Sequence, residues 1–289
     1  FGHSDDAKTT RVSVDEGFGD EYLSSEKSSR TFSSEKSTEH TAKDSVSEEE
    51  CRENQRHYRQ LLLDTYKQDD DGDTRLHTAI IQLLCDIALY FISLAPTHTL
   101  LNLKNNYLQT PLHLAVITKQ DVLTRKLMTA GAQVDSRDHK GNTPLHIASR
   151  EGYHFFAKIL LEPIRYEETV HNRYELPYQE IPQNMEARNY DGQVSVHLAA
   201  EGCHIETLDV LLSKGANVNA RDGKSGRTAL HYAAESGCMP LLNYLVKQQH
   251  CKLDINCTTY GGLTPIMLAK GRCHDKAVRL LKESGAWSD

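Results

Sequence analysis

Short blocks of apolar residues recur along most of the chain, and each block has the spacing of an amphipathic helix. Apolar side chains stand three or four residues apart in 208–212 and again in 241–246, and this period is typical of a helix with one buried face. Gly131 and Gly215 follow such blocks, at the point where a left-handed residue commonly ends a helix. From about residue 70 onward, the pattern therefore predicts an all-α protein built from short helices.

One four-residue motif occurs six times and sets the period of these blocks. Its clearest copies read Thr-Pro-Leu-His, and the six copies start at Thr74, Thr110, Thr143, Val194, Thr228 and Thr264. Thr suits a helix N-cap, and Pro suits the first helical position because the N–H that it lacks would have no partner there. Turn residues precede most copies, as in Lys140-Gly141 and Asp191-Gly192. The pattern predicts six helix–turn–helix units of about 33 residues each.

On this motif and period, the chain resembles the ankyrin-repeat family over residues 70–289. The resemblance implies an all-α ankyrin-repeat solenoid with a disordered N-terminal tail, in which each repeat buries its core against its neighbours. The expected repeats are 70–105, 106–138, 139–188, 189–222, 223–259 and 260–289.

The third repeat is longer than the others. Thr143 and Val194 are 51 residues apart, so we expect an insertion, at about 163–183. Its polar composition fits a tolerated surface loop and a partner-contacting loop equally well.

A His closes the motif in five copies: His77, His113, His146, His197 and His231. In this setting we interpret them as structural residues that bond turn backbone between neighbouring repeats. No nucleophile–base pair and no metal-ligand spacing emerges from the sequence. We therefore predict no catalytic residues, no metal site and no cofactor, and we expect that the protein is not an enzyme.

The first 55 residues differ in composition from the rest. They are rich in Ser and acidic residues and poor in large apolar side chains, which predicts a disordered regulatory tail. Residues 56–69 are expected to form a linker with a short amphipathic helix around Leu61, Leu62 and Tyr66, acting either as a packing cap or as a recognition helix. Because the chain begins with Phe1, we expect it to be a fragment.

Charge and cysteine content narrow the function. A formal charge of −7 disfavours direct binding to nucleic acid, and no apolar run is long enough to span a membrane. Seven cysteines without a Cys-x-x-Cys pair indicate reduced thiols in a cytosolic or nuclear protein.

Finer features resemble the IκB inhibitors, most closely those of the Cactus type. These features are the six repeats, the enlarged third repeat, the Ser-rich acidic leader and the local sequences at 71–77, 109–118 and 226–231. The resemblance implies a cytoplasmic inhibitor, able to shuttle into the nucleus, that binds a Rel/NF-κB dimer in Toll-type immune or developmental signalling. A nuclear IκB-type coregulator and a generic ankyrin adaptor remain as alternatives.

The tail contains a segment with the layout of the IκB degron, formed by Asp15, Glu16, Gly17, Phe18 and Asp20. The resemblance implies phosphorylation by an IκB kinase, recognition by a ubiquitin ligase and degradation, but acidic residues stand here where the family has serines. The segment could be a permanent mimic, an altered sequence or an ordinary acidic stretch. Ser45 and Ser47 are alternative phosphorylation candidates, and Lys8 is a candidate ubiquitin acceptor.

An acidic run opens the first repeat: Asp69, Asp70, Asp71 and Asp73. It is either a solvated face or, as the resemblance implies, the surface that neutralises the basic nuclear-localisation segment of a Rel protein. The hairpin tips of later repeats are the other expected partner contacts, at Arg188, Tyr190, Arg221, Asp222 and Tyr260.

Overall fold

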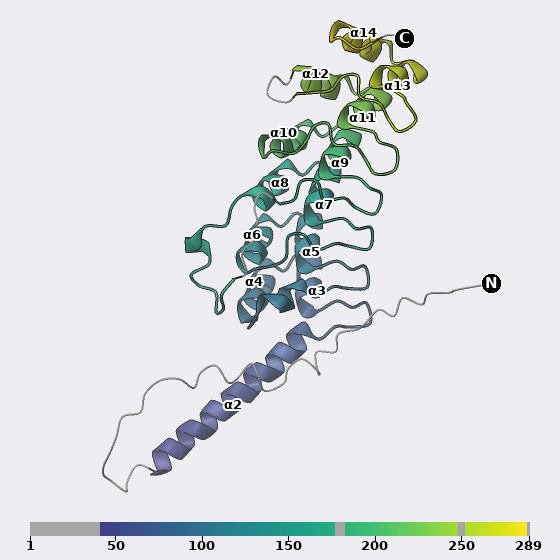
Figure 1. Ribbon diagram of the computed structural model, residues 1–289. Coiled ribbons are helices and arrows are strands. Elements are labelled where there is room, and N and C mark those ends of the chain that lie inside the picture. The colour runs from purple at the N-terminus through teal and green to yellow at the C-terminus, as the bar shows by residue number, and fades with distance from the viewer. Residues whose placement is uncertain (1–40, 177–182, 248–251, 288–289) are drawn as a thin grey trace, which may run out of the picture. The chain divides into compact units, whose positions relative to one another are not determined.

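The structure is a computed structural model that describes the backbone of residues 41–176, 183–247 and 252–287 (Figure 1). Side chains are described from Glu50 onward within these ranges. The chain divides into two units, residues 1–67 and 68–289, and each is described by itself.

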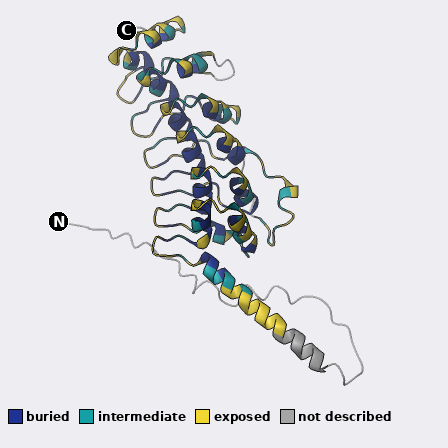
Figure 2. Ribbon diagram, turned by 180° about the vertical axis from the view of Figure 1, so that it is seen from behind, coloured by how far each residue is buried: buried dark blue, intermediate teal, exposed yellow. Residues whose placement is uncertain are grey.

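The first unit contains one long helix, α2, from Thr41 to Tyr66. The sequence analysis placed residues 41–55 in the tail, whereas α2 begins at Thr41. That prediction rested on the lack of apolar surface, whereas Glu, Gln, Arg and Lys favour a helix locally, without burial. Side chains from Glu50 to Arg56 are exposed, while Leu62 and Tyr66 are buried (Figure 2).

The second unit consists of six helix pairs, as the motif predicts. The first helices of the pairs are α3 (Arg75–Ile81), α5 (Pro111–Ile117), α7 (Pro144–Arg150), α9 (Ser195–Glu201), α11 (Ala229–Ser236) and α13 (Pro265–Gly271). The second helices are α4 (Cys85–Leu94), α6 (Asp121–Thr129), α8 (His154–Leu161), α10 (Ile205–Ser213), α12 (Met239–Lys247) and α14 (Asp275–Glu283). Figure 1 shows the first helices in one row, the second helices in another, and the hairpin loops projecting together to one side. The fold is the expected all-α ankyrin solenoid.

Two features of the motif explain how the first helices begin and pack: the Thr N-cap and the small Ala. Thr74, Thr143 and Thr264 are N-caps whose hydroxyls accept the backbone N–H three residues on. One turn into each first helix stands an Ala with at most 3% of its surface exposed, and this small side chain lets neighbouring helices approach closely. These residues are Ala79, Ala115, Ala148, Ala199, Ala233 and Ala269.

The insertion of the third repeat is fastened to the second repeat. A short 3₁₀ helix, η3 (Tyr166–Glu168), places Glu168 beside Arg125 of α6, with the closest guanidinium–carboxylate distance at 2.6 Å. The same guanidinium donates to the carbonyls of Glu162 and Pro163. Tyr174 donates to the Ala130 carbonyl at 2.8 Å. Over its described part, the insertion is thus a docked loop.

Candidate partner-binding surface

Four of the five motif histidines bond the repeat that follows their own. In all five, Nδ1 accepts the N–H of the N-cap residue at 3.0–3.3 Å. In four of them, Nε2 also reaches a carbonyl of the following repeat, as His113 reaches Asn142 at 3.1 Å, whereas Nε2 of His197 reaches the Ala220 carbonyl within its own repeat. Because a carbonyl can only accept, Nε2 carries the proton and each ring is neutral. The structural role predicted for these histidines is confirmed.

Burial lowers the pKa of all five motif histidines, since desolvation penalises the charged ring. The pKa falls to about 4 for both His113 and His146. A second proton would sit on Nδ1, which faces an N–H donor. Neutral, buried imidazoles therefore hold the backbone together on the side of the solenoid that carries the hairpins.

The hairpin tips are shaped by an Asp or Asn that starts each of the first five. The side-chain oxygen of this residue accepts backbone N–H groups two and four residues on, as Asn189 does from Asp191 and Gln193 at 3.0 and 2.9 Å. Asp69, Asn105, Asp138 and Asp222 do the same in their own hairpins. These residues fix the turn, which is a structural role that the sequence analysis did not assign.

Backbone hydrogen bonds then join successive tips. Asn106 donates to the Asp71 carbonyl, Tyr190 to the Lys140 carbonyl and Tyr260 to the Ser225 carbonyl, at 2.9–3.0 Å. A Gly in the left-handed region completes most turns, for instance Gly141 at φ 75°. Tips joined in this way form a continuous, preorganised edge.

The acidic run lies on the first of these tips, and its four carboxylates differ in role. Asp69 holds the turn, and Asp73 accepts from the Asn105 amide at 3.0 Å. Asp70 and Asp71 are exposed, and within the described residues no hydrogen bond or ion pair engages either carboxylate. Of the acidic run, Asp70 and Asp71 are thus the two carboxylates available to a partner.

The residues predicted as partner contacts on the later hairpins also differ in role: some are exposed and one is buried. Tyr190 and Tyr260 are 65% and 62% exposed, and Arg188 and Arg221 are exposed as well. Asp222 is 2% exposed, so its assignment as a surface contact was wrong. Burial alone would raise the pKa of Asp222, but hydrogen bonds from Ser225, Tyr232 and a turn N–H lower it to about 2. It is a buried anion that holds its own hairpin.

Comparison with known proteins identifies the chain. The family model for ankyrin repeats in three copies matches residues 93–173, 119–222, 167–259 and 196–288. The crystal structure of the ankyrin repeat domain of Bcl-3, a member of the IκB family, aligns with a TM-score of 0.64 and 33% identity, covering 76% of this chain and 89% of that chain. This chain is an ankyrin-repeat protein of the IκB family.

Curated relatives agree with that placement. This IκB-family chain is 41% identical to the NF-kappa-B inhibitor cactus of Drosophila melanogaster over 76% of its own length and 46% of the relative. It is 36% identical to NF-kappa-B inhibitor alpha of Gallus gallus, over 70% of its own length and 59% of the relative. The chain therefore spans less than two thirds of either relative.

The tail residues of this IκB-family chain are placed only in part. Lys8 and the degron-like segment Asp15–Asp20 lie outside the described residues. Ser45 and Ser47 fall in the first turns of α2, where only the backbone is described. Within the described residues, no helix is long and apolar enough for a membrane span, and no cluster of three His, Cys, Asp or Glu could hold a metal ion.

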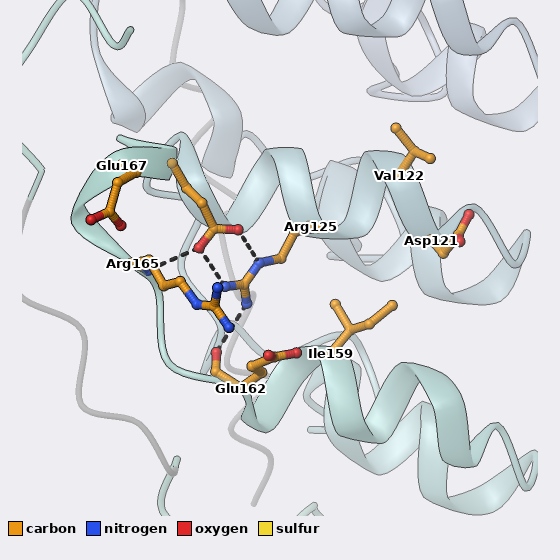
Figure 3. A pocket seen from close by; sticks show the side chains of 8 residues that line it. Asp121, Val122, Arg125, Ile159, Glu162, Arg165 and Glu167 are labelled. Carbon is orange, nitrogen blue, oxygen red and sulfur yellow. Dashed lines mark hydrogen bonds and ion pairs between the residues drawn. The ribbon is translucent and has the colours of Figure 1, made fainter. Parts of the chain in front are cut away.

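A shallow pocket of about 510 Å³ lies where the insertion meets α6 and α8 (Figure 3). Its lining includes Asp121, Glu162, Arg165 and Glu167, and Arg125 spans it to reach Glu168. The Arg125 guanidinium is occupied by its carboxylate and carbonyl partners, and the hydrogen bond to Glu168 is the largest cause of its raised pKa. The pocket is thus lined by the contacts that hold the insertion against α6.

The sequence analysis missed one surface feature of this IκB-family repeat array. The first repeat exposes several large apolar side chains around α4 and the turn before it. They are Ile81, Leu83, Leu84, Ile87 and Tyr90, each 42–62% exposed. Their signal was present as non-polar residues at positions that are polar in some later repeats, such as Leu83 where the second repeat has Lys119.

Proposed function

We propose that the chain is a cytoplasmic inhibitor that binds Rel/NF-κB transcription factors through its ankyrin repeats. The likeness to proteins named NF-kappa-B inhibitors supports this role. The observation that carries the mechanism is the pair of exposed, unengaged carboxylates, Asp70 and Asp71, on a tip that Asn106 holds through two hydrogen bonds.

In this mechanism, the first hairpin neutralises the basic nuclear-localisation segment of a Rel protein. Because the two carboxylates have no internal partners, they can bind Lys and Arg without breaking bonds within the protein. The backbone of the tip is already fixed, so binding costs little conformational entropy there. The exposed apolar side chains of the first repeat, such as Leu83 and Ile87, would pack against the apolar residues of the same segment. A segment covered in this way is not accessible to the nuclear import machinery.

Later tips would contact the Rel dimerisation domains through Arg188, Tyr190, Arg221 and Tyr260. Their exposure on a hydrogen-bonded edge supports this role, since aromatic and Arg side chains are frequent anchors at interfaces. Charge contacts at the first hairpin would mainly affect association rate and salt dependence.

The decisive experiment compares the parent chain with an Asp70→Asn/Asp71→Asn variant for binding to a purified Rel dimer. These two positions avoid Asp69 and Asp73, whose side chains support the fold. We expect about twofold to thirtyfold weaker binding, because exposed ion pairs contribute about 0.2–1 kcal/mol each. The salt dependence should also become shallower.

Glu206→Gln/Glu283→Gln is the matched control, because it removes two exposed carboxylates from α10 and α14 and should leave binding unchanged. Unchanged affinity and salt slope in the Asp70/Asp71 variant would eliminate the charge mechanism. Failure of the parent chain to bind any Rel dimer or to keep it from DNA would eliminate the inhibitor role and leave the adaptor alternative.

Removal of the inhibitor is the second part of the proposal. A kinase would phosphorylate the tail, with Ser45 and Ser47 as candidates beside the degron-like segment, and a ubiquitin ligase would then modify Lys8. A Glu16→Ala/Asp20→Ala variant should outlive the parent chain in cells if the acidic segment is a working degron. Cell fractionation separates this scheme from the nuclear coregulator, which would reside in the nucleus without stimulation.

A further inference from the structure

The turn between the two helices of each repeat carries a residue in the left-handed region, and in the third and fifth repeats a side chain of the next repeat lies against it. Gly152 has φ 73° and Gly237 has φ 66°. A Cβ on Gly152 would lie 2.4 Å from Nδ1 of His204, and one on Gly237 would lie 2.7 Å from Nδ1 of His274. A left-handed turn residue and the residue of the next repeat that lies against it form a facing pair.

Between the fourth and fifth repeats, both members of the facing pair are cysteines. Cys203 is the left-handed residue, at φ 56°. Cys238, which directly follows Gly237, stands where the flanking facing pairs have His204 and His274. The Cys203 sulfur lies 3.8 Å from Oγ of Ser236, two residues before Cys238, and the Cys238 thiol contributes to the raised pKa of Cys203. Repeat stacking therefore brings together two sulfurs that are 35 positions apart in the sequence.

Both sulfurs can react with small molecules. Cys203 and Cys238 are partly exposed and unbridged, whereas Cys257 is buried. Burial, with a further contribution from the Cys238 sulfur, raises the pKa of Cys203 to about 11. Cys203 therefore holds its proton at neutral pH, and the Cys238 sulfur is the atom of the pair that would attack an electrophile first.

We propose that Cys203 and Cys238 form a redox-modification site that a two-electron oxidant of the peroxide class converts to a disulfide between neighbouring repeats. The Cys238 sulfur attacks one peroxide oxygen, the O–O bond breaks, and a sulfenic acid and one water form. The Cys203 sulfur then attacks the Cys238 sulfur. The S–S bond forms, and the hydroxyl leaves with the Cys203 proton as a second water. Two thiols are oxidised and one hydrogen peroxide is reduced.

A disulfide at this place would lock the fourth repeat to the fifth. In a solenoid, each repeat is held only by its neighbours, so a covalent link across one interface prevents the repeats on either side from separating. The inference concerns this chain alone and goes beyond the proposed inhibition of Rel proteins.

Peptide mapping of the whole chain tests the site. Trypsin cleaves after Lys and Arg, which places Cys203 in peptide 189–214 and Cys238 in peptide 228–247, with no other cysteine in either. After treatment with hydrogen peroxide and blocking of remaining thiols with N-ethylmaleimide, we expect a linked 189–214/228–247 peptide. Dithiothreitol should convert it to the two separate peptides.

The fold supplies matched variants. Cys203→Gly and Cys238→His each install the residue found in the flanking facing pairs, so both should fold and both should lose the linked peptide. Cys273→Gly changes the equivalent turn residue of the sixth repeat and should leave the linked peptide unaffected. Circular dichroism confirms equal helix content in all variants.

Two results would overturn the site: both cysteines recovered with N-ethylmaleimide after peroxide, or Cys203 linked to a different cysteine. No Rel protein takes part, so a negative result would leave the proposed inhibitor role standing.

Discussion

The motif histidines should make the repeat array sensitive to mild acid. The rings of His113 and His146 each accept an N–H at Nδ1 and donate to a carbonyl of the next repeat at Nε2, so protonation removes the first bond and places a charge in a buried site. His113 and His146 have pKa values of about 4, lowered by burial from an ordinary value of 6.5. The perturbation is a shift of pH from 7 to 5.

The sign follows from proton linkage. Below pH 6.5 the unfolded chain binds protons at these rings, whereas the folded chain does not until the pH approaches 4. The contribution of the neutral rings to stability is therefore fully present above pH 6.5 and is lost progressively as the pH falls towards 4. At pH 5, each of the two rings lowers the free energy of unfolding by about 2 kcal/mol, since each full unit of pKa difference is worth about 1.4 kcal/mol. The pair together removes about 4 kcal/mol.

Urea unfolding followed by circular dichroism at pH 7, 6 and 5 measures this loss. In a His113→Gln/His146→Gln variant, the starting stability will be lower, but the decrease between pH 7 and 5 should shrink by about 4 kcal/mol. A control with exposed rings, His154→Gln/His171→Gln, should keep the acid sensitivity of the parent chain. The carboxyl of Asp222, with a pKa of about 2, titrates below this window.

An unchanged pH dependence in the His113/His146 variant would refute the reasoning. It would mean that the rings are not neutral in the folded chain or that other groups dominate the loss. An equal effect of the exposed-ring control would refute it as well.

Four further predictions concern the hairpins and the insertion. Asp222→Asn should destabilise the chain by about 2 kcal/mol in urea unfolding, because charged hydrogen bonds to Ser225 and Tyr232 are lost; unchanged stability would contradict the assigned role. Leu108, at φ 56°, holds the turn position occupied by Gly in other hairpins, so Leu108→Gly should relieve about 1 kcal/mol of backbone strain. Gly141→Ala should instead destabilise by more than about 1 kcal/mol, because the Cβ would lie 2.7 Å from the Tyr190 ring; the same thermal-unfolding scan tests both, and shifts of the same sign would contradict the argument. Arg125→Ala should open residues 163–176 to limited proteolysis, and an unchanged cleavage pattern would show that the ion pair to Glu168 does not fasten the insertion.

Much of this architecture was readable from local sequence signals. Thr at an N-cap, Pro at the first helical turn and Gly at a left-handed turn act through their own backbone geometry. Their recurrence at about 33 residues was sufficient to predict six repeats and the structural role of the motif histidines. The spacing of Thr143 and Val194 also located the insertion.

Other features were not readable because their signals conflict or are not local. The tail composition predicts too little apolar surface for a core, yet the same Glu, Gln and Arg residues favour α2. Within the acidic run, the sequence does not separate Asp69, which holds the turn, from Asp70, which is free. That division follows from backbone N–H groups oriented by the hairpin.

The sequence by itself thus determined the period, the starts of the first helices and the family, since each copy of the motif acts through contacts within about four residues. Only the tertiary structure decided the burial of Asp222, the docking of the insertion by Arg125 and the meeting of Cys203 with Cys238. Each of these depends on how one repeat is stacked on the next or on an earlier one. Residues tens of positions apart become neighbours only when the buried faces of successive repeats have closed over one another.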